Sequence, residues 1–548
     1  MSSVRARGSA IAAVAACLLS VLVLRPPAEA QESYQRISGE GSSWAAGAID
    51  AMRVNVKQFG ITVDYNPSGS SAGRKNFLNG TVDFAASDIP FQFRPEDGSA
   101  PENPAPGSYA YIPVTAGGTA FMYNLKINGQ RVTNLRLSGE NVAKIFTGAI
   151  TEWNDPALQA DNPGLTMPAR KIVPVVRSDG SGSSAQFTRW LIHLHGGLWD
   201  DYCRRSGRAP ACGFTSYYPT IAGMIAQSGD LGVSGYVAQS FAEGAIGYVN
   251  YSYAIGAQFP VAKVLNTAGY YTEPTPENVA VSLLKARINT DAGSDEYLTQ
   301  ILDDVYTDPD PRSYQLSSYS YFILPTTIQG QFNEAKGKTL GAFAYYAMCQ
   351  AQQQSASLGY SPMPINLVQA SFDQIRKIPG VEVQSIDITK CKNPTFSADG
   401  TNLLAANAPQ PQPCDKQGPT QCATGSGGVK QVATPVAPSA AGVEAAGPAA
   451  SGAVTASASG DGAAADPAAS GDLAAAPVCD PDTGVCTGGS GASAALGSAV
   501  SAAATPTMLS DSSGWSSVQT LAAVVILLTL GLVFAPAAAW RAFGEGRR

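Results

Sequence analysis

The sequence is poor in the residues that metal sites and hydrolytic enzymes use. It has only two histidines, His193 and His195, and none of its nine cysteines stands in a Cys-x-x-Cys pair. Structural zinc sites need a full set of nitrogen or sulfur ligands, so neither a metal nor any other cofactor is expected. Charged residues make up 14% of the chain and the formal net charge is −7, which argues against the broad basic surface that nucleic-acid binding requires. An anion bound here must be held by a local site.

The chain also lacks the pattern of a serine hydrolase. The nucleophile-elbow motif Gly-x-Ser-x-Gly is not met around Gly180-Ser181-Gly182. His193 and His195 are two positions apart on one predicted helix. At 3.6 residues per turn their side chains point in different directions, so the helix is not expected to place both in one catalytic site. The chain is therefore not expected to be an enzyme, and an exported hydrolase is the less favoured alternative.

The N-terminus has the three parts of a secretory signal peptide. Arg5 and Arg7 precede an apolar run over residues 10–24, and Ala28-Glu29-Ala30 provides the small residues of a cleavage site. Residues 1–30 are predicted to be removed. Cys17 lies in a segment that loosely resembles a lipoprotein box, and its acylation stays open.

The C-terminus has one long uncharged apolar segment, residues 518–540. About 22 residues at a rise of about 1.5 Å cover roughly 33 Å, enough to cross a bilayer. Arg541, Arg547 and Arg548 follow, so the positive-inside rule places residues 541–548 in the cytoplasm. We expect a single-pass protein of the cell membrane with everything between the two ends outside the cytoplasm.

Eight cysteines remain once Cys17 is set aside, and they fall into neighbouring pairs. In an exported chain an even number of cysteines favours disulfides. The predicted pairs are Cys203 with Cys212, Cys349 with Cys391, Cys414 with Cys422, and Cys479 with Cys486.

Composition divides the exported part into a folded region and a stalk. Residues 31–402 alternate β-rich runs with helical patterns, which predicts an α/β fold. Residues 403–515 are dominated by Ala, Gly, Ser, Pro and Thr and are predicted to form a flexible stalk.

Three Ser/Gly turns in the folded region pass directly into predicted helices. They are Gly41-Ser42-Ser43, Gly69-Ser70-Ser71, and the run Asp179-Gly180-Ser181-Gly182-Ser183. Each offers hydroxyl groups and free backbone N–H groups at the positive end of a helix, which is a common anion site. Arg177 stands just before the third turn, where its guanidinium can bind two oxygens of an anion.

Asp88 needs its own explanation, because a carboxylate repels an anion unless that anion donates a proton. Phosphate carries such a proton at neutral pH and sulfate does not. A buried acceptor left unpaired by the wrong ligand rejects it strongly. Asp88 is therefore predicted to discriminate between the two anions.

Five segments of the chain resemble, in the same order, the phosphate-binding proteins of bacterial ABC importers. They are residues 37–44, 65–73, 81–88, 176–187 and 244–249, with further similarity at 141–155 and 358–364. The resemblance covers the whole folded region. It implies a class II periplasmic-binding-protein-like fold with two α/β lobes that close on the ligand by hinge motion. Residues 31–120 and 265–402 would form lobe 1 and residues 121–264 lobe 2, with an insertion over residues 193–220.

The resemblance also implies a role for each candidate residue. Ser42, Ser43 and Trp44 would bind phosphate, Ser70 would donate its hydroxyl, and Asp88 would accept the phosphate proton. From the other lobe, Arg177, Ser181, Gly182 and Ser183 would complete the site, with Asp179 orienting Arg177. The family usually has Thr, Phe and Thr where this chain has Ser43, Trp44 and Ser183; Ser keeps the hydroxyl, and Trp keeps a large apolar side chain.

The partners implied are inorganic phosphate and the permease and ATPase complex of an ABC importer, with no nucleic acid. A membrane-anchored phosphate receptor or scaffold without a transport role is the alternative. The stalk does not decide between them, since both roles require a flexible tether.

Overall fold

The computed structural model describes residues 34–208 and 212–437, and the backbone alone of residues 478–479 and 486–487. The chain divides into two compact units, residues 1–455 and 456–548. The described part of the second unit is an antiparallel strand pair, β16 (Val478–Cys479) and β17 (Cys486–Thr487). All other described elements belong to the first unit.

Several predictions from sequence fall outside this description. The signal peptide, the apolar segment 518–540 and the tail 541–548 are among the residues that are not described, and so are the side chains of Cys479 and Cys486. Within the described residues, no helix combines the length and the apolar character needed to span a membrane.

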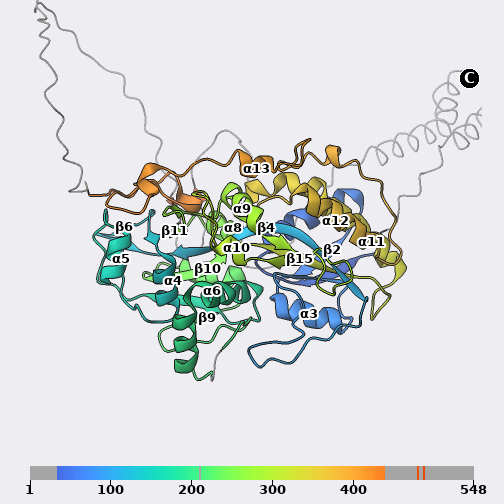
Figure 1. The fold of residues 1–548 in the computed structure, drawn as a ribbon, viewed down its shortest axis with the longest axis horizontal. Coiled ribbons are helices and arrows are strands. Elements are labelled where there is room, and N and C mark those ends of the chain that lie inside the picture. The colour runs from blue at the N-terminus through green and yellow to red at the C-terminus, as the bar shows by residue number, and fades with distance from the viewer. Residues whose placement is uncertain (1–33, 209–211, 438–477, 480–485, 488–548) are drawn as a thin grey trace, which may run out of the picture. The chain divides into compact units, whose positions relative to one another are not determined.

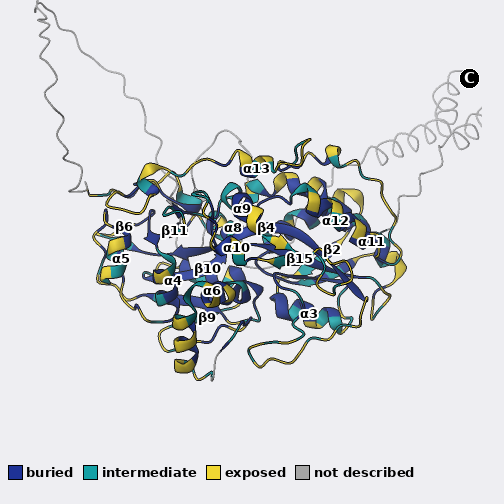
Figure 2. Cartoon of the chain, in the orientation of Figure 1, coloured by how far each residue is buried: buried dark blue, intermediate teal, exposed yellow. Residues whose placement is uncertain are grey.

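The first lobe is built on a sheet that begins with three parallel strands. β1 (Ile37–Gly41) lies between β2 (Val63–Asn66) and β3 (Phe84–Ser87), and β15 (Ser317–Pro325) continues the sheet antiparallel to β3. The helices of this lobe are α2 (Ala46–Asn55), α3 (Ser70–Leu78), α9 (Pro276–Ser282), α10 (Asp303–Tyr306), α11 (Glu334–Met348) and α12 (Ile365–Ile375). β3 and β15 are buried along their whole length and β1 and β2 in part, while exposed residues lie mainly on the outer helices and loops (Figure 2).

The second lobe repeats the α/β plan. β8 (Val173–Arg177) pairs in parallel with β10 (Ala245–Asn250) and β9 (Ile225–Gln227), while β11 (Val261–Leu265) pairs with β7 (Arg136–Leu137) and β12 (Tyr271–Thr272). Its helices are α4 (Gly139–Phe146), α5 (Pro156–Asp161), α6 (Gly182–Arg205), α7 (Gly229–Val237) and α8 (Tyr251–Gly256). The expected two-lobed α/β architecture is therefore present.

One long strand, β4 (Tyr109–Tyr123), belongs to both lobes (Figure 1). Residues up to Gly118 pair with β15, and residues from Thr119 pair with β10. A Cβ atom at position 117 would lie 2.9 Å from the Trp44 ring. Glycine at this point therefore lets Trp44 pack directly against the crossing strand.

Three of the four predicted disulfides lie in the described region, and all three are formed. Cys203 pairs with Cys212, Cys349 with Cys391, and Cys414 with Cys422. The segment after Cys212 belongs to the insertion expected over residues 193–220. Its Phe214 backbone N–H donates to Glu96 and its Thr215 hydroxyl donates to Asp97, at 3.0 and 2.5 Å, so the segment also contacts the first lobe.

The folded body continues past residue 402, which corrects the predicted start of the stalk. Residues 403–437, called the strap below, begin with α13 (Leu403–Ala406) and then follow the second lobe (Figure 1). There, for example, Asn134 donates to the Cys422 carbonyl and Lys263 pairs with Asp415, each at 2.7 Å. Composition predicted a flexible stalk here because the segment has few apolar residues. Polar hydrogen bonds, an ion pair and a disulfide hold it on the folded body instead of a large apolar core.

Candidate anion-binding site

Four helix N-termini meet where the two lobes touch. The turns before α2 and α3 come from the first lobe, and those before α6 and α7 come from the second. The Ser71 backbone N–H donates across the lobes to the Gly180 carbonyl at 2.9 Å. All three Ser/Gly turns noted in the sequence are therefore brought together, and the partial positive charges of their helices converge.

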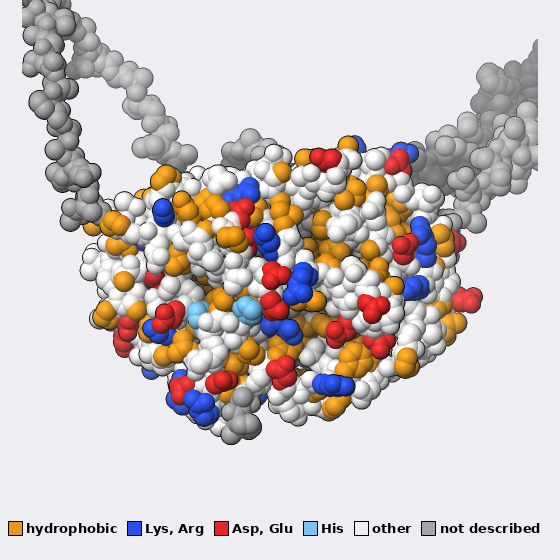
Figure 3. Space-filling view, viewed as in Figure 1, with side chains coloured by type: hydrophobic (Ala, Val, Ile, Leu, Met, Phe, Trp, Pro, Cys, Tyr) orange, Lys and Arg blue, Asp and Glu red, His pale blue; other side chains and the backbone are white. Residues whose placement is uncertain are grey.

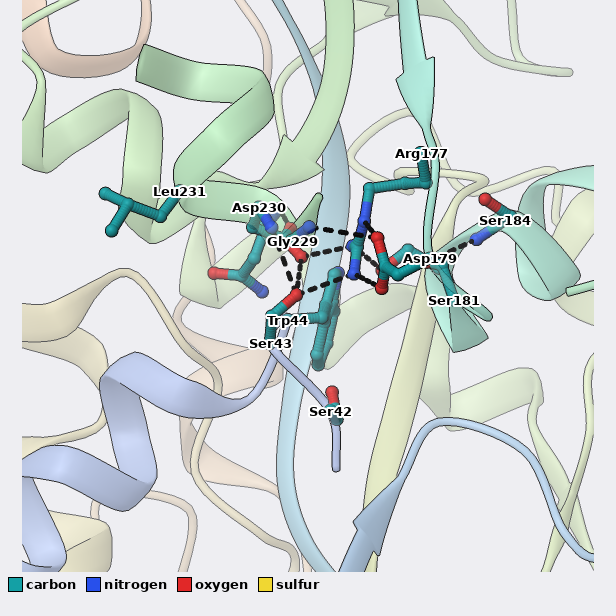
Figure 4. Close-up of polar contacts among 12 residues, drawn as sticks. Ser42, Ser43, Trp44, Arg177, Asp179, Ser181, Ser184, Gly229, Asp230 and Leu231 are labelled. Atoms are coloured by element: carbon teal, nitrogen blue, oxygen red, sulfur yellow. Dashed lines mark hydrogen bonds and ion pairs between the residues drawn. The ribbon is translucent and has the colours of Figure 1, made fainter. Parts of the chain in front are cut away.

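Arg177 lies at the end of β8 (Figure 4), and it is buried. Its guanidinium donates to both oxygens of Asp179, at 2.8 and 2.5 Å, and to Asp230 Oδ2 at 2.5 Å. It also donates to the hydroxyls of Ser43 at 2.8 Å and Ser183 at 3.4 Å. Burial alone would lower its pKa, but Asp230 and Asp179 raise the pKa above the usual arginine value. Arg177 therefore stays charged.

Asp179 orients Arg177, as the sequence predicted. Burial opposes its charge, but the hydrogen bond from Arg177 holds the pKa of Asp179 below its usual value. The Gly229 backbone N–H adds a bond to Asp179 at 2.9 Å. The pair thus joins β8 to the start of α7.

Asp88 is 2% exposed and lies directly after β3. Its carboxylate accepts hydrogen bonds from the hydroxyls of Ser42 at 2.6 Å, Ser320 at 2.8 Å and Ser70 at 3.3 Å. Burial raises the pKa of Asp88 to about 6, against the hydrogen bonds from Ser42 and Ser320. At neutral pH the group is mostly ionised and can accept further hydrogen bonds.

Gly182 and Ser181 bring the second lobe onto this carboxylate. A Cβ atom at position 182 would lie 2.5 Å from Ser70 Oγ and 2.6 Å from Asp88 Oδ2, so only glycine fits. Ser181 is the N-cap of α6, where its side chain accepts from the Ser184 backbone N–H at 3.1 Å. The Ser181 hydroxyl oxygen is therefore already used to cap the N-terminus of α6.

Trp44 contributes its backbone to this region while its ring points away. The ring is 1% exposed, donates to the Thr119 hydroxyl at 3.2 Å and packs edge-on against Tyr360. The large apolar side chain at this position thus packs between the loop after β1 and the crossing strand β4.

Two residues beside these groups were not among the sequence candidates. Ser320 comes from β15, and no local motif marks it. Asp230 is fully buried and joins Ser43 to Arg177. It follows Ser228-Gly229 and lies in the first turn of α7. This is the same Ser/Gly-turn pattern as the other three, so that signal could have found it.

Across residues 34–208 and 212–437, no group of His, Cys, Asp and Glu could hold a metal ion. On the face drawn in Figure 3, acidic and basic side chains are interspersed over both lobes.

Comparison with known proteins identifies the family. The PBP superfamily domain matches residues 26–351. Phosphate-binding protein PstS 2 of Mycobacterium tuberculosis is 32% identical over 315 residues, which covers 56% of this chain and 76% of that protein. The chain belongs to the PstS family of the PBP superfamily. PstS of Haemophilus influenzae is 29% identical and covers 57% of this chain and 84% of its own.

Similar proteins are also found among solved structures. A phosphate-binding protein from Stenotrophomonas maltophilia is 20% identical with a TM-score of 0.45, and covers 61% of this chain and 92% of its own.

Proposed function

We propose that this protein captures inorganic phosphate outside the cytoplasm and delivers it to an ABC importer. The observation that carries the proposal is that buried donors from one lobe and a buried acceptor from the other lie where the lobes meet. Arg177 and the N-terminus of α6 offer donors from the second lobe, and Asp88 offers an acceptor from the first. Membership of the PstS family supports the same ligand.

Asp88 favours phosphate over sulfate. A dry, ionised carboxylate repels a fully ionised anion, whereas an anion that still carries a proton can donate to it. Phosphate and arsenate carry such a proton near neutral pH, and sulfate does not. Among the candidate residues we assign Ser42, Ser43, Ser70, Ser183, Gly182 and the backbone of Trp44 as further contacts, with Ser181 and Asp179 supporting them.

Isothermal titration of the purified full-length chain with phosphate, sulfate and arsenate tests this function. We expect binding of phosphate and arsenate and none of sulfate. Absence of phosphate binding, or sulfate binding of equal strength, would refute the proposed ligand.

The membrane anchor belongs to the same proposal and rests on the sequence alone. If residues 518–540 span the membrane, a chain that ends at Ser513 should appear in the soluble fraction with its phosphate affinity unchanged. Should the shortened chain stay with membranes, replacing Cys17 in the same background separates an acylated N-terminus from an error in the topology.

A further inference from the structure

Asp230 connects the donors of both lobes. Its Oδ2 accepts from Arg177 Nη1 at 2.5 Å and from the Ser43 hydroxyl at 2.6 Å, and its Oδ1 accepts from the Asn250 backbone N–H at 2.7 Å (Figure 4). Its own backbone N–H donates to Ser43 Oγ at 3.0 Å. The side chain is fully buried, so these contacts are made out of reach of bulk water.

Asp230 and an incoming anion would compete for the same hydrogen-bond donors. A serine hydroxyl has one proton to donate, and Ser43 gives it to Asp230. One N–H of Arg177 Nη1 is also directed to Asp230 and the other to Ser183. A phosphate oxygen that binds Ser43 or Arg177 must therefore draw these donors away from a carboxylate that already holds them.

The charges around this point are unbalanced. Among the described residues, Arg177 is the one basic side chain that hydrogen-bonds to the buried carboxylates Asp179 and Asp230. The third buried carboxylate, Asp88, accepts from serine hydroxyls instead. Tyr253 and Tyr360 also face Asp230, and Tyr248 lies beside Arg177 and Asp179; burial raises the pKa of each above the usual tyrosine value, so they stay neutral. Helix N-termini offset part of the excess negative charge, each with about half an elementary charge.

We infer that Asp230 makes the site select the singly charged, dihydrogen form of phosphate over the doubly charged form. This inference rests on the proposed phosphate-binding function and adds a residue that sets which ionisation state is bound. Each extra negative charge on the ligand meets an excess of buried carboxylates, of which Asp230 is the one that holds a side-chain donor from each lobe, Ser43 and Arg177. The dihydrogen form brings one charge fewer and a second proton to donate.

The pH dependence of binding tests the inference in the unaltered full-length chain. Above the pKa of Asp88, phosphate itself is the group whose charge changes. We expect phosphate affinity to fall as the pH rises from about 6.5 to 8.5, approaching about tenfold per pH unit when one proton must accompany the ligand. A flat profile over this range would overturn the selection, whereas no binding at any pH would refute the phosphate-binding function itself.

The variant Asp230→Asn separates selection from a structural role. Removing a buried like charge shifts such equilibria by roughly one to three pH units, so we expect phosphate affinity at about pH 8.5 to rise about tenfold and the profile to flatten. A residue that only supports the fold would instead lose affinity equally at both ends of the range, and that outcome would overturn the inference. Asp230→Ser, also neutral, decides the matter if the asparagine variant does not fold.

Asp161→Asn is the matched control. Asp161 is also a buried carboxylate of the second lobe, but it accepts from Ser138, Asn141 and Tyr271, away from the anion site. Its variant should keep the pH profile of the unaltered chain; if it flattened that profile as Asp230→Asn does, the effect could not be assigned to Asp230.

Discussion

At the scale of single residues, Asp88→Asn should relax the discrimination between phosphate and sulfate. An amide can donate a hydrogen bond where the carboxylate could only repel. Since a hydrogen bond to a charged group contributes about 1.5–3 kcal/mol, phosphate affinity should fall about ten- to hundredfold, while sulfate binding becomes measurable. Isothermal titration with both anions checks this result, and undetectable sulfate binding in the variant would count against the role of Asp88.

Acidification of the unaltered chain offers a control that needs no substitution. Burial raises the pKa of Asp88 to about 6, so the carboxyl gains a proton as the pH falls through that value and becomes a donor. Sulfate binding should therefore appear below about pH 6 and be absent at about pH 7.5.

Replacing Arg177 should remove most binding, because it leaves a dehydrated anion without its compensating charge. Loss of one partner of a buried ion pair costs about 3–5 kcal/mol, which corresponds to a decrease in affinity of about 10²- to 10⁴-fold for Arg177→Ala. Asp179 and Asp230 would also lose their partner, so the variant should unfold at a lower temperature. Arg177→Lys keeps the charge but loses the planar guanidinium, so its phosphate affinity should lie between those of the unaltered chain and Arg177→Ala. Calorimetry that finds the affinity of Arg177→Ala within a few-fold of the unaltered chain would contradict this account.

The sequence located most of these residues because each stands in a local pattern. Ser42, Ser70 and Ser181 lie in Ser/Gly turns before helices, and Arg177 ends an apolar strand. Ser320 could not be found this way, since its contact with Asp88 spans 232 positions and depends on the pairing of β15 with β3. Asp230 carried a usable signal, but its partner Ser43 is 187 positions away, so its role depends on how the lobes close.

At the scale of elements, the turn after Cys212 forms a contact between the second lobe and the first. The bonds from Phe214 to Glu96 and from Thr215 to Asp97 join the two lobes at a point supported by the Cys203–Cys212 disulfide. Each bond must break before the lobes separate. The turn therefore favours the closed arrangement.

Asp97→Ala should accelerate release of phosphate without changing its capture. One hydrogen bond contributes about 0.5–1.5 kcal/mol, so the dissociation rate should rise about two- to tenfold while the association rate stays the same. Stopped-flow measurement of both rates decides this. Asp64→Ala, which removes an exposed carboxylate paired with Arg36 outside this contact, should change neither rate, and an equal effect in that variant would exclude a specific role for the turn.

At the scale of the whole molecule, the strap joins the two lobes on its way toward the C-terminus. Near its start, Arg312 donates to the carbonyls of Ala405 and Ala408 at 3.1 and 3.3 Å. Farther along, Ser426 and Thr434 bond to Val261 and Thr133 of the second lobe. These contacts could not be predicted from the sequence, because residues 403–437 have a low apolar content and polar pairing leaves no periodic hydrophobic pattern.

The strap should therefore stabilise the folded body, and two truncated chains can show it. A chain that ends at Asn402 loses the strap, whereas one that ends at Ala437 keeps it, and neither contains residues 438–548. Without the strap, Lys263 is left without Asp415, and the backbone groups of Thr133 and Val261 lose their partners at a cost of about 1–3 kcal/mol for each one that stays buried. We expect the chain that ends at Asn402 to unfold at a lower temperature and to be cleaved faster by proteases in its second lobe. Equal melting temperatures of the two chains would show that the strap lies on the body without supporting it.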